Sequence, residues 1–217
     1  MSDIFQEVDE EVRRERLKQV WERYSGLIVG VALLIILGLG GWRGYQWWEA
    51  KKAAEAGAVF ESAVALANEG KRAEAEAAFG RIASEASSGY RVLARLRQAA
   101  ELATHDREGA VRAYDALAND SSVTSTLRDL ANVRAALLLV DAAPFETIRA
   151  RLEPLTAAGR PFRHTAREVL AFAAFRAGDM TAARPWLQAI VADPETPPGV
   201  RARTDMLMAL AAPEAKS

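Results

Sequence analysis

The side chains best suited to catalysis are few in this sequence and are not grouped. The 217 residues include two histidines, His105 and His164, and no cysteine. His105 adjoins Asp106 at an expected turn and His164 lies near an expected helix start, so we expect both to be solvated. There is no phosphate-binding glycine loop, nucleophile elbow or metal-spaced pair. Carboxylates are spread over helix faces among arginines rather than paired as acid and base. We therefore expect neither an enzyme nor a bound metal or cofactor.

The composition favours packed helices. Half of the residues are hydrophobic, and few runs of β-branched residues, which favour strands, occur among them. The formal net charge of −1 argues against general binding to nucleic acid. The sequence thus predicts an all-α protein with no nucleic-acid partner.

An uncharged apolar segment, residues 24–42, lies between Arg23 and Arg43. As an α-helix it spans roughly 28 Å, about the thickness of the hydrocarbon core of a bilayer. Amphipathic aromatic side chains favour the headgroup region, and they are concentrated at both ends of the segment. The predicted membrane-interface anchors are Trp21, Tyr24, Trp42, Tyr45, Trp47 and Trp48. We predict a membrane-spanning helix.

The segment is expected to be a retained signal anchor rather than a cleaved signal peptide. Its apolar run is longer than the roughly 7–15 residues typical of a signal peptide, and it ends in GWRGYQWW, a poor cleavage site. Basic residues before the span outnumber those after it, which predicts a cytoplasmic N-terminus and, in a bacterial inner membrane, a periplasmic C-terminal domain. The residues compared are Arg13, Arg14, Arg16, Lys18 and Arg23 before the span, and Arg43, Lys51 and Lys52 after it.

These features divide the protein into four predicted regions. Residues 1–23 form a cytoplasmic amphipathic helix, which is either a solvated extension of the span or a docking helix. Residues 24–42 cross the membrane, residues 43–55 extend the helix, and residues 56–217 form a periplasmic repeat domain. Gly26 and Gly30 in the span would let a second helix approach closely, which leaves a homodimer open.

The repeat domain is identified from a recurring pattern of small and large residues. Phe79 and Tyr114 are 35 positions apart, as are Leu152 and Leu187, and a three-residue insertion near residues 142–144 aligns the two pairs. A period in the mid-thirties predicts stacked helix–turn–helix units. The expected second-helix positions are Ala75, Phe79 and Ile82; Ala110, Tyr114 and Leu117; Ile148, Leu152 and Leu155; and Ala183, Leu187 and Ile190.

The connections and the end of the array are also predicted. Gly70 and Gly178 are expected to make turns within the first and last of about four hairpins, since glycine adopts turn conformations at little steric cost. A capping helix is expected between Val200 and Leu210, with Met206, Leu207 and Leu210 on its packed side.

These spacings resemble tetratricopeptide repeats, although the usual first-helix Trp, Leu-Gly and Tyr are absent and only Asp193-Pro194 matches the closing proline. With LKQVWERYSG before the span, GWRGYQWW after it and degenerate repeats beyond, the whole sequence resembles the YfgM-like family of ancillary SecYEG translocon subunits. The resemblance implies a scaffold near the Sec channel. The implied partners are Sec channel subunits, a PpiD-type periplasmic folding factor and exported polypeptides.

Stacked hairpins usually bind partners on the concave face formed by their first helices. By repeat phase, the candidate partner groove comprises Phe60, Val64, Arg91, Gln98, Glu101, Arg128, Asn132, Phe172 and Phe175. The alternative is that the aromatic members pack between helices and the arginines are solvated. An export or folding scaffold is the predicted function, and an envelope assembly or division scaffold, or a regulatory module acting through the cytoplasmic helix, remains open.

Overall fold

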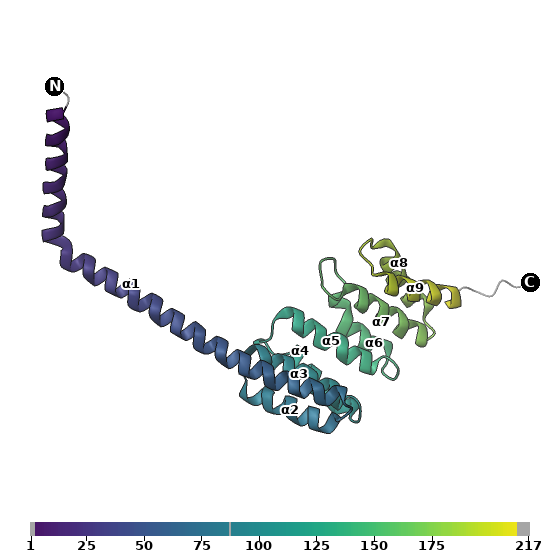
Figure 1. Ribbon diagram of the computed structural model, residues 1–217. Helices are drawn as coiled ribbons and strands as arrows, with labels where there is room; N and C mark the ends of the chain where they lie inside the picture. The colour runs from purple at the N-terminus through teal and green to yellow at the C-terminus, as the bar shows by residue number, and fades with distance from the viewer. Residues whose placement is uncertain (1–2, 87, 212–217) are drawn as a thin grey trace, which may run out of the picture. The chain divides into compact units, whose positions relative to one another are not determined.

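The computed structural model describes residues 3–86 and 88–211, which contain helices and no strand (Figure 1). The protein divides into two compact units, residues 1–54 and 55–217. The all-α fold is therefore confirmed. The helices are α1 (Asp3–Asn68), α2 (Arg72–Glu85), α3 (Ser88–Leu102), α4 (Arg107–Ala118), α5 (Ser125–Leu139), α6 (Phe145–Leu152), the 3-10 helix η1 (Glu153–Leu155), α7 (Arg163–Arg176), α8 (Met180–Ala192) and α9 (Pro198–Ala211).

The described part of the first unit belongs to a single helix. α1 begins at Asp3 and continues through residues 24–42 without a break. An α-helix satisfies its backbone hydrogen bonds internally, so the glycines of this segment are compatible with a helix in lipid. The side chains of Arg13, Arg14 and Arg16, on which the predicted orientation partly rests, lie outside the described part of the protein.

The described residues of the second unit, 55–86 and 88–211, form four helical hairpins and a closing helix. The end of α1 packs on α2 through Ala63 and Phe79, and the following pairs are α3 with α4, α5 with α6 and α7 with α8. All twelve predicted second-helix positions are at most 4 % exposed. The pattern of small and large residues therefore marks the side of each second helix that packs into the domain.

The residues at the N-termini of the second helices repeat with the predicted spacing. They are Lys71, Asp106, Pro144 and Asp179, separated by 35, 38 and 35 positions. Asp106 Oδ1 accepts a hydrogen bond from Gly109 N at 2.8 Å, and Asp179 Oδ1 accepts one from Ala182 N at 2.9 Å. These two aspartates satisfy N–H groups that have no partner within the first turn of a helix.

Gly70 and Gly178 make equivalent turns, as predicted. Their φ angles are 79° and 74°, in the left-handed region that favours glycine. Gly70 N donates to Ala67 O and the next N–H donates to Leu66 O, a pattern that closes a helix on its own carbonyls. At the end of α7, Gly178 N donates to Phe175 O and Asp179 N donates to Ala174 O in the same pattern.

The capping helix α9 is rotated relative to the prediction. Leu207 is buried, together with Val200 and Thr204, but Met206 and Leu210 are 65 % and 70 % exposed. Arg203 Nη2 donates to the buried carboxylate of Glu168 on α7 at 3.0 Å. The two residues of this ion pair are 35 positions apart in the sequence. The side of α9 that packs therefore includes Leu207, as predicted, but is shifted toward Val200 and Thr204.

Asp193 joins the two helices of the last hairpin. Its carboxylate accepts hydrogen bonds at 2.9 Å from Arg163 Nε and from Arg167 Nη1, both on α7. The prediction of a solvated His164 is wrong, because this side chain is 12 % exposed and its Nδ1 lies 3.2 Å from Thr196 Oγ1. Burial and the neighbouring Arg163 lower the pKa of His164.

We predict that Gly70→Ala and Gly178→Ala each destabilise the repeat domain. A left-handed backbone costs an L-residue about 1–2 kcal/mol, and each kcal/mol lowers the melting temperature of a domain of this size by about 2–4 °C. Thermal unfolding of the full-length protein in detergent, followed by circular dichroism at 222 nm, measures the loss. Gly89→Ala is the control: Gly89 lies in α3, and an added Cβ would meet nothing within 4 Å. Equal melting temperatures for all three variants would contradict the prediction.

We also predict acid sensitivity from Asp193. Hydrogen bonds from Arg163, and next from Arg167, hold the pKa of Asp193 well below its ordinary value. A carboxyl whose pKa is lowered by folding stabilises the folded state above its unfolded pKa of about 3.9 and loses that contribution as the pH falls. The melting temperature should therefore drop less between pH 5 and pH 2 in Asp193→Asn than in the unsubstituted protein. The exposed Asp205→Asn should retain the full dependence, and a parallel profile for Asp193→Asn would refute the assignment.

Candidate membrane-contact and partner-binding sites

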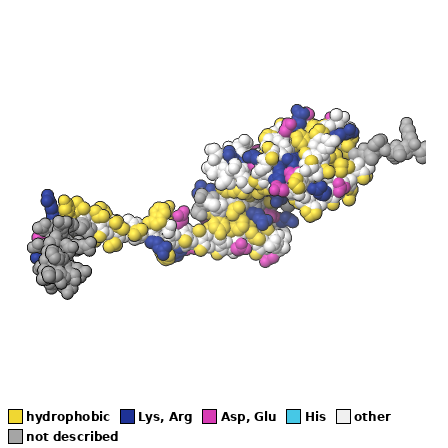
Figure 2. Space-filling view, turned by 90° about the horizontal axis from the view of Figure 1, so that it is seen from above, with side chains coloured by type: hydrophobic (Ala, Val, Ile, Leu, Met, Phe, Trp, Pro, Cys, Tyr) yellow, Lys and Arg dark blue, Asp and Glu magenta, His cyan; other side chains and the backbone are white. Residues whose placement is uncertain are grey.

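The described side chains of the apolar segment of α1 are exposed, apart from the half-buried Ser25. Leu34 and Leu37 are 72 % and 71 % exposed, and hydrophobic side chains gather along the described part of this helix (Figure 2). Within the part of the protein that the structure describes, α1 is the helix long and apolar enough to cross a membrane. Exposed apolar surfaces of this size usually mark contacts with a membrane or with another protein.

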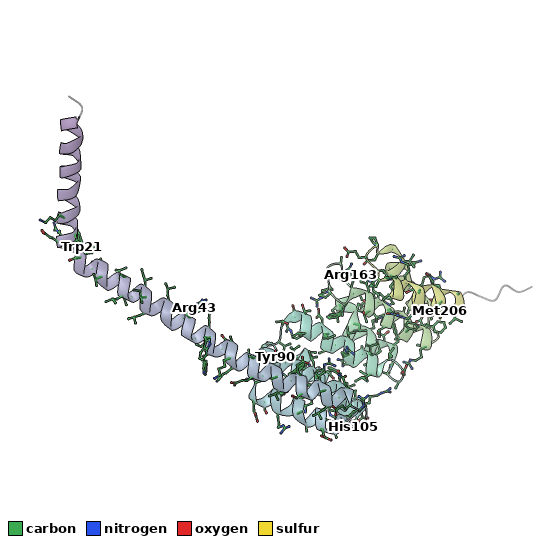
Figure 3. The ribbon with its side chains drawn as sticks, viewed as in Figure 1. Trp21, Arg43, Tyr90, His105, Arg163 and Met206 are labelled. Carbon is green, nitrogen blue, oxygen red and sulfur yellow. The ribbon has the colours of Figure 1, made fainter. Side chains whose placement is uncertain are left out.

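Aromatic and basic side chains lie at both ends of this segment. The labelled Trp21 and Arg43 lie at its two ends in Figure 3. Lys52 Nζ lies 3.8 Å from the centroid of the Trp48 ring, and Lys51 Nζ lies 5.7 Å from that of Trp47, distances at which a cation is attracted to a ring face. All six predicted anchors, Trp21, Tyr24, Trp42, Tyr45, Trp47 and Trp48, are exposed. The arrangement suits a water–lipid boundary.

Several residues of the predicted partner groove lie in or beside the packed interior of the first two hairpins. The ring of Phe60 lies 5.3 Å from Phe79 and 5.8 Å from Tyr90, centroid to centroid, and Val64 packs on the same cluster. Gln98 lies against the backbone of Gly80 on α2. Glu101 is buried, and its carboxylate accepts a 3.1 Å hydrogen bond from Arg72.

The remaining groove residues are distributed over three first helices. Arg91 is exposed and donates to Ala86 O at 3.1 Å. Phe175 packs on the cluster formed by α7, α8 and α9, whereas Phe172 on the same helix is exposed. Arg128 and Asn132 are one turn apart on α5, and the structure brings them together in one cleft.

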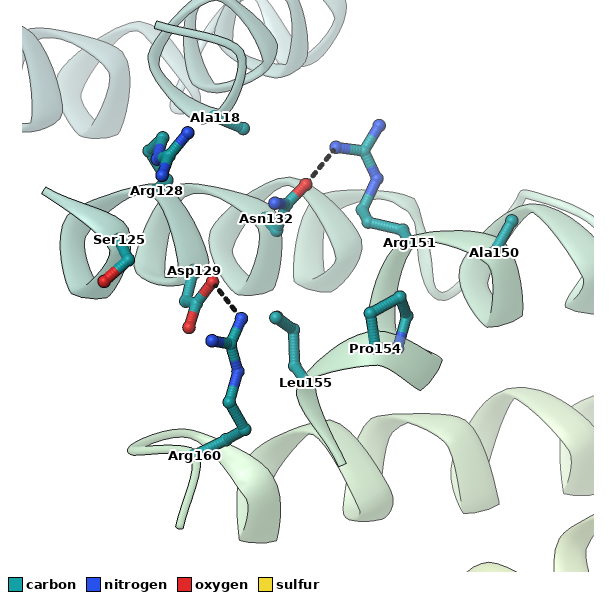
Figure 4. A pocket seen from close by; sticks show the side chains of 10 residues that line it. All are labelled: Ala118, Ser125, Arg128, Asp129, Asn132, Ala150, Arg151, Pro154, Leu155 and Arg160. Carbon is teal, nitrogen blue, oxygen red and sulfur yellow. Dashed lines mark hydrogen bonds and ion pairs between the residues drawn. The ribbon is translucent and has the colours of Figure 1, made fainter. Parts of the chain in front are cut away.

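The cleft has a volume of about 410 Å³ and is formed mainly by α5, α6 and η1 (Figure 4). The guanidinium groups of Arg151, on α6, and Arg160, in the connection before α7, extend toward α5. Arg160 Nη2 donates to Asp129 at 2.9 Å, and Arg151 Nη1 lies 3.4 Å from Asn132 Oδ1. The lining consists of Ala118, Ser125, Arg128, Asp129, Asn132, Ala150, Arg151, Pro154, Leu155 and Arg160.

Sequence reasoning missed Arg151, Arg160 and Asp129. Arg151 also forms an ion pair with Asp115 on α4, 36 positions away, and Arg160 pairs with a residue 31 positions away. Because these separations are close to the length of one repeat, the ion pairs connect one hairpin to the next part of the array. A single sequence rich in arginine and acids does not show which of many such pairs forms.

Comparison with known proteins gave one result. The model of a family described as tetratricopeptide repeat-like domain matches residues 18–193, which is more than half of the sequence and includes the apolar segment. Searches of curated proteins and of solved structures found no match.

Proposed function

Because the protein belongs to the tetratricopeptide repeat-like domain family, we propose that it is a membrane-anchored scaffold that binds other proteins through its stacked hairpins. The observation that carries this proposal is the combination of an exposed apolar helix with a helical-repeat domain in one polypeptide. Domains of this family generally bind proteins rather than catalyse reactions. The family match begins at residue 18, before the apolar segment, which supports a span that belongs to the mature protein.

The finer part of the proposal concerns place and partners. The excess of basic residues before the span supports a cytoplasmic N-terminus and a periplasmic repeat domain. The sequences flanking the span resemble those of YfgM-like proteins, which supports a position beside the Sec channel. There the repeats would hold a PpiD-type folding factor and newly exported polypeptides.

The absence of cysteine allows a direct test of orientation. We predict that a membrane-impermeant maleimide labels Ala209→Cys in spheroplasts, whereas it labels Lys18→Cys only after lysis. Both positions are exposed, so access to the reagent decides the result. Labelling of Lys18→Cys alone in intact spheroplasts would reverse the orientation, and labelling of both would contradict a membrane-spanning anchor.

The partner proposal is tested by affinity purification of the full-length protein from native membranes in mild detergent, with mass spectrometry of the recovered proteins. We expect Sec channel subunits and a periplasmic folding factor at near-stoichiometric yield. Recovery of division or envelope-assembly proteins in their place would overturn the translocon role and retain the scaffold. Recovery of no protein above a control membrane would overturn the scaffold itself.

Two variants assign the contact to a region of the protein. If the protein contacts the Sec channel within the membrane, replacement of residues 24–42 by an unrelated span should abolish recovery of the channel subunits and leave recovery of the folding factor unchanged. Deletion of residues 2–20 should leave both partners in place. Loss of the partners after this deletion would instead favour a regulatory module that recruits proteins through the cytoplasmic helix.

A further inference from the structure

We propose that residues 43–52 of α1, which follow the apolar segment, bind the headgroup of a phospholipid that carries a net negative charge. This inference rests on the membrane anchoring in the proposed function, but not on the orientation of the protein or on its partners. The lipid would belong to the leaflet on the C-terminal side of the span. A site of this kind selects one class of lipid, whereas aromatic anchors alone favour the water–lipid boundary of any bilayer.

The three cations of this segment lie on one side of the helix together with two tryptophans. Arg43 and Lys51 are eight positions apart with Trp47 halfway between them, and Trp48 and Lys52 are four positions apart. Residues four apart are neighbours on the surface of an α-helix, and α1 is continuous through this segment. The five side chains therefore form two adjacent rows, and all of them are exposed.

The cations of these rows have no acidic partner among the side chains that the structure describes. Every ion pair in that part of the protein joins residues between 69 and 203. The acid of the segment, Glu49, is two positions from both Trp47 and Lys51, and side chains two apart on a helix do not face each other. Three positive charges and one negative charge leave a net charge of +2 for a ligand to neutralise.

The lysine side chains extend back toward the apolar segment. Lys52 Nζ lies 3.8 Å from the centroid of the Trp48 ring, and Lys51 Nζ lies 5.7 Å from that of Trp47. Both rings belong to the preceding turn, which is the direction in which helical side chains lean. At 1.5 Å per residue this turn is roughly 8 Å beyond Trp42. The two ammonium groups are therefore held at the depth of the lipid headgroups.

Glycines leave space for the rest of the lipid on the membrane side of the tryptophans. Gly44 is one turn before both Trp47 and Trp48, and Gly40 is one turn before Gly44. A Cβ added at either glycine would meet nothing within 4 Å. The Tyr45 ring lies 6.3 Å from that of Trp48, centroid to centroid, and borders this space. The acyl chains would lie against the backbone of α1 while the cations contact the phosphate.

The charge of the segment favours an anionic phospholipid over a zwitterionic one. The phosphate of either lipid accepts hydrogen bonds from ammonium and guanidinium groups. A choline headgroup adds a cation of its own, which the three basic side chains would repel, whereas a glycerol headgroup adds none. Basic residues beside a span are attracted to anionic lipids for this reason. We therefore expect phosphatidylglycerol to bind in preference to phosphatidylcholine.

Native mass spectrometry of the full-length protein in a neutral detergent tests the site. Phosphatidylglycerol and phosphatidylcholine with the same acyl chains are added in equal amounts, and the ratio of the two bound lipids measures the selectivity. The unsubstituted protein should prefer phosphatidylglycerol. Lys51→Gln/Lys52→Gln should lower the ratio about fivefold for each lysine, the factor expected for one basic residue at an anionic surface.

The matched control is Arg81→Gln/Arg184→Gln, which removes the same charge from exposed positions of the repeat domain and should leave the ratio unchanged. Glu49→Gln should not lower the ratio, because it removes a negative charge. Trp48→Leu should lower it, because Lys52 loses the ring that positions its ammonium group. Soluble glycerol phosphate should not displace the bound lipid, since it lacks acyl chains. Circular dichroism at 222 nm checks that each variant folds.

Three results would each overturn the site: no preference for phosphatidylglycerol, equal ratios for the lysine variant and its control, or displacement of the lipid by glycerol phosphate. A dimer that carries no phosphatidylglycerol would also overturn it, and would assign the glycine surface to a second copy of the helix. Purification from native membranes separates these failures from failure of the scaffold. If partners are recovered without a lipid preference, only the lipid site is lost. If the preference is present and no partner is recovered, the scaffold function fails and the lipid site stands.

Discussion

The repeat domain depends on the close approach of two helices within each hairpin. Ala75, Ala110 and Ala183 are fully buried on the second helices, and a methyl group there leaves room for the neighbouring helix. The side chain four positions later, Phe79 in the first hairpin and Tyr114 in the second, then fills the space that remains. No single hairpin buries its apolar face alone, so stability accumulates from contacts between neighbours.

Arginine–carboxylate pairs add a second kind of contact between successive units. The buried acids Glu101, Asp129 and Glu168 are bonded to Arg72, Arg160 and Arg203, respectively. Each pair joins a first helix to an element outside its own hairpin. Removing one partner would leave an uncompensated charge in the interior, whereas the intact pair contributes less to stability than to fixing which surfaces meet. Acidic and basic residues occur in nearly equal numbers in the whole sequence, which has a formal net charge of −1.

The fold was predictable because its evidence is local and repeated. Twelve buried positions share one spacing, and Gly70 and Gly178 occupy equivalent turns. The rotation of α9 was not predictable, since Arg203 is drawn to a carboxylate 35 positions away. The burial of His164 and the cleft were not predictable for the same reason, since both depend on contacts between residues more than 30 positions apart. Phe60 and Phe172 are both aromatic residues of first helices, yet only the first is packed, because rotation about a helix axis is set by neighbours that the local sequence does not reveal.

The connection between α5 and α6, residues 140–144, is one or two residues longer than its counterparts within the other hairpins, and the buried pattern is kept on either side of it. Asp141 and Ala142 in this connection are exposed. The arginine-lined cleft involves the beginning of α5 and the end of α6, so this connection is at the opposite end of the hairpin. A fluorophore or an epitope inserted there would report on the domain in living cells while leaving the stacking and the cleft intact.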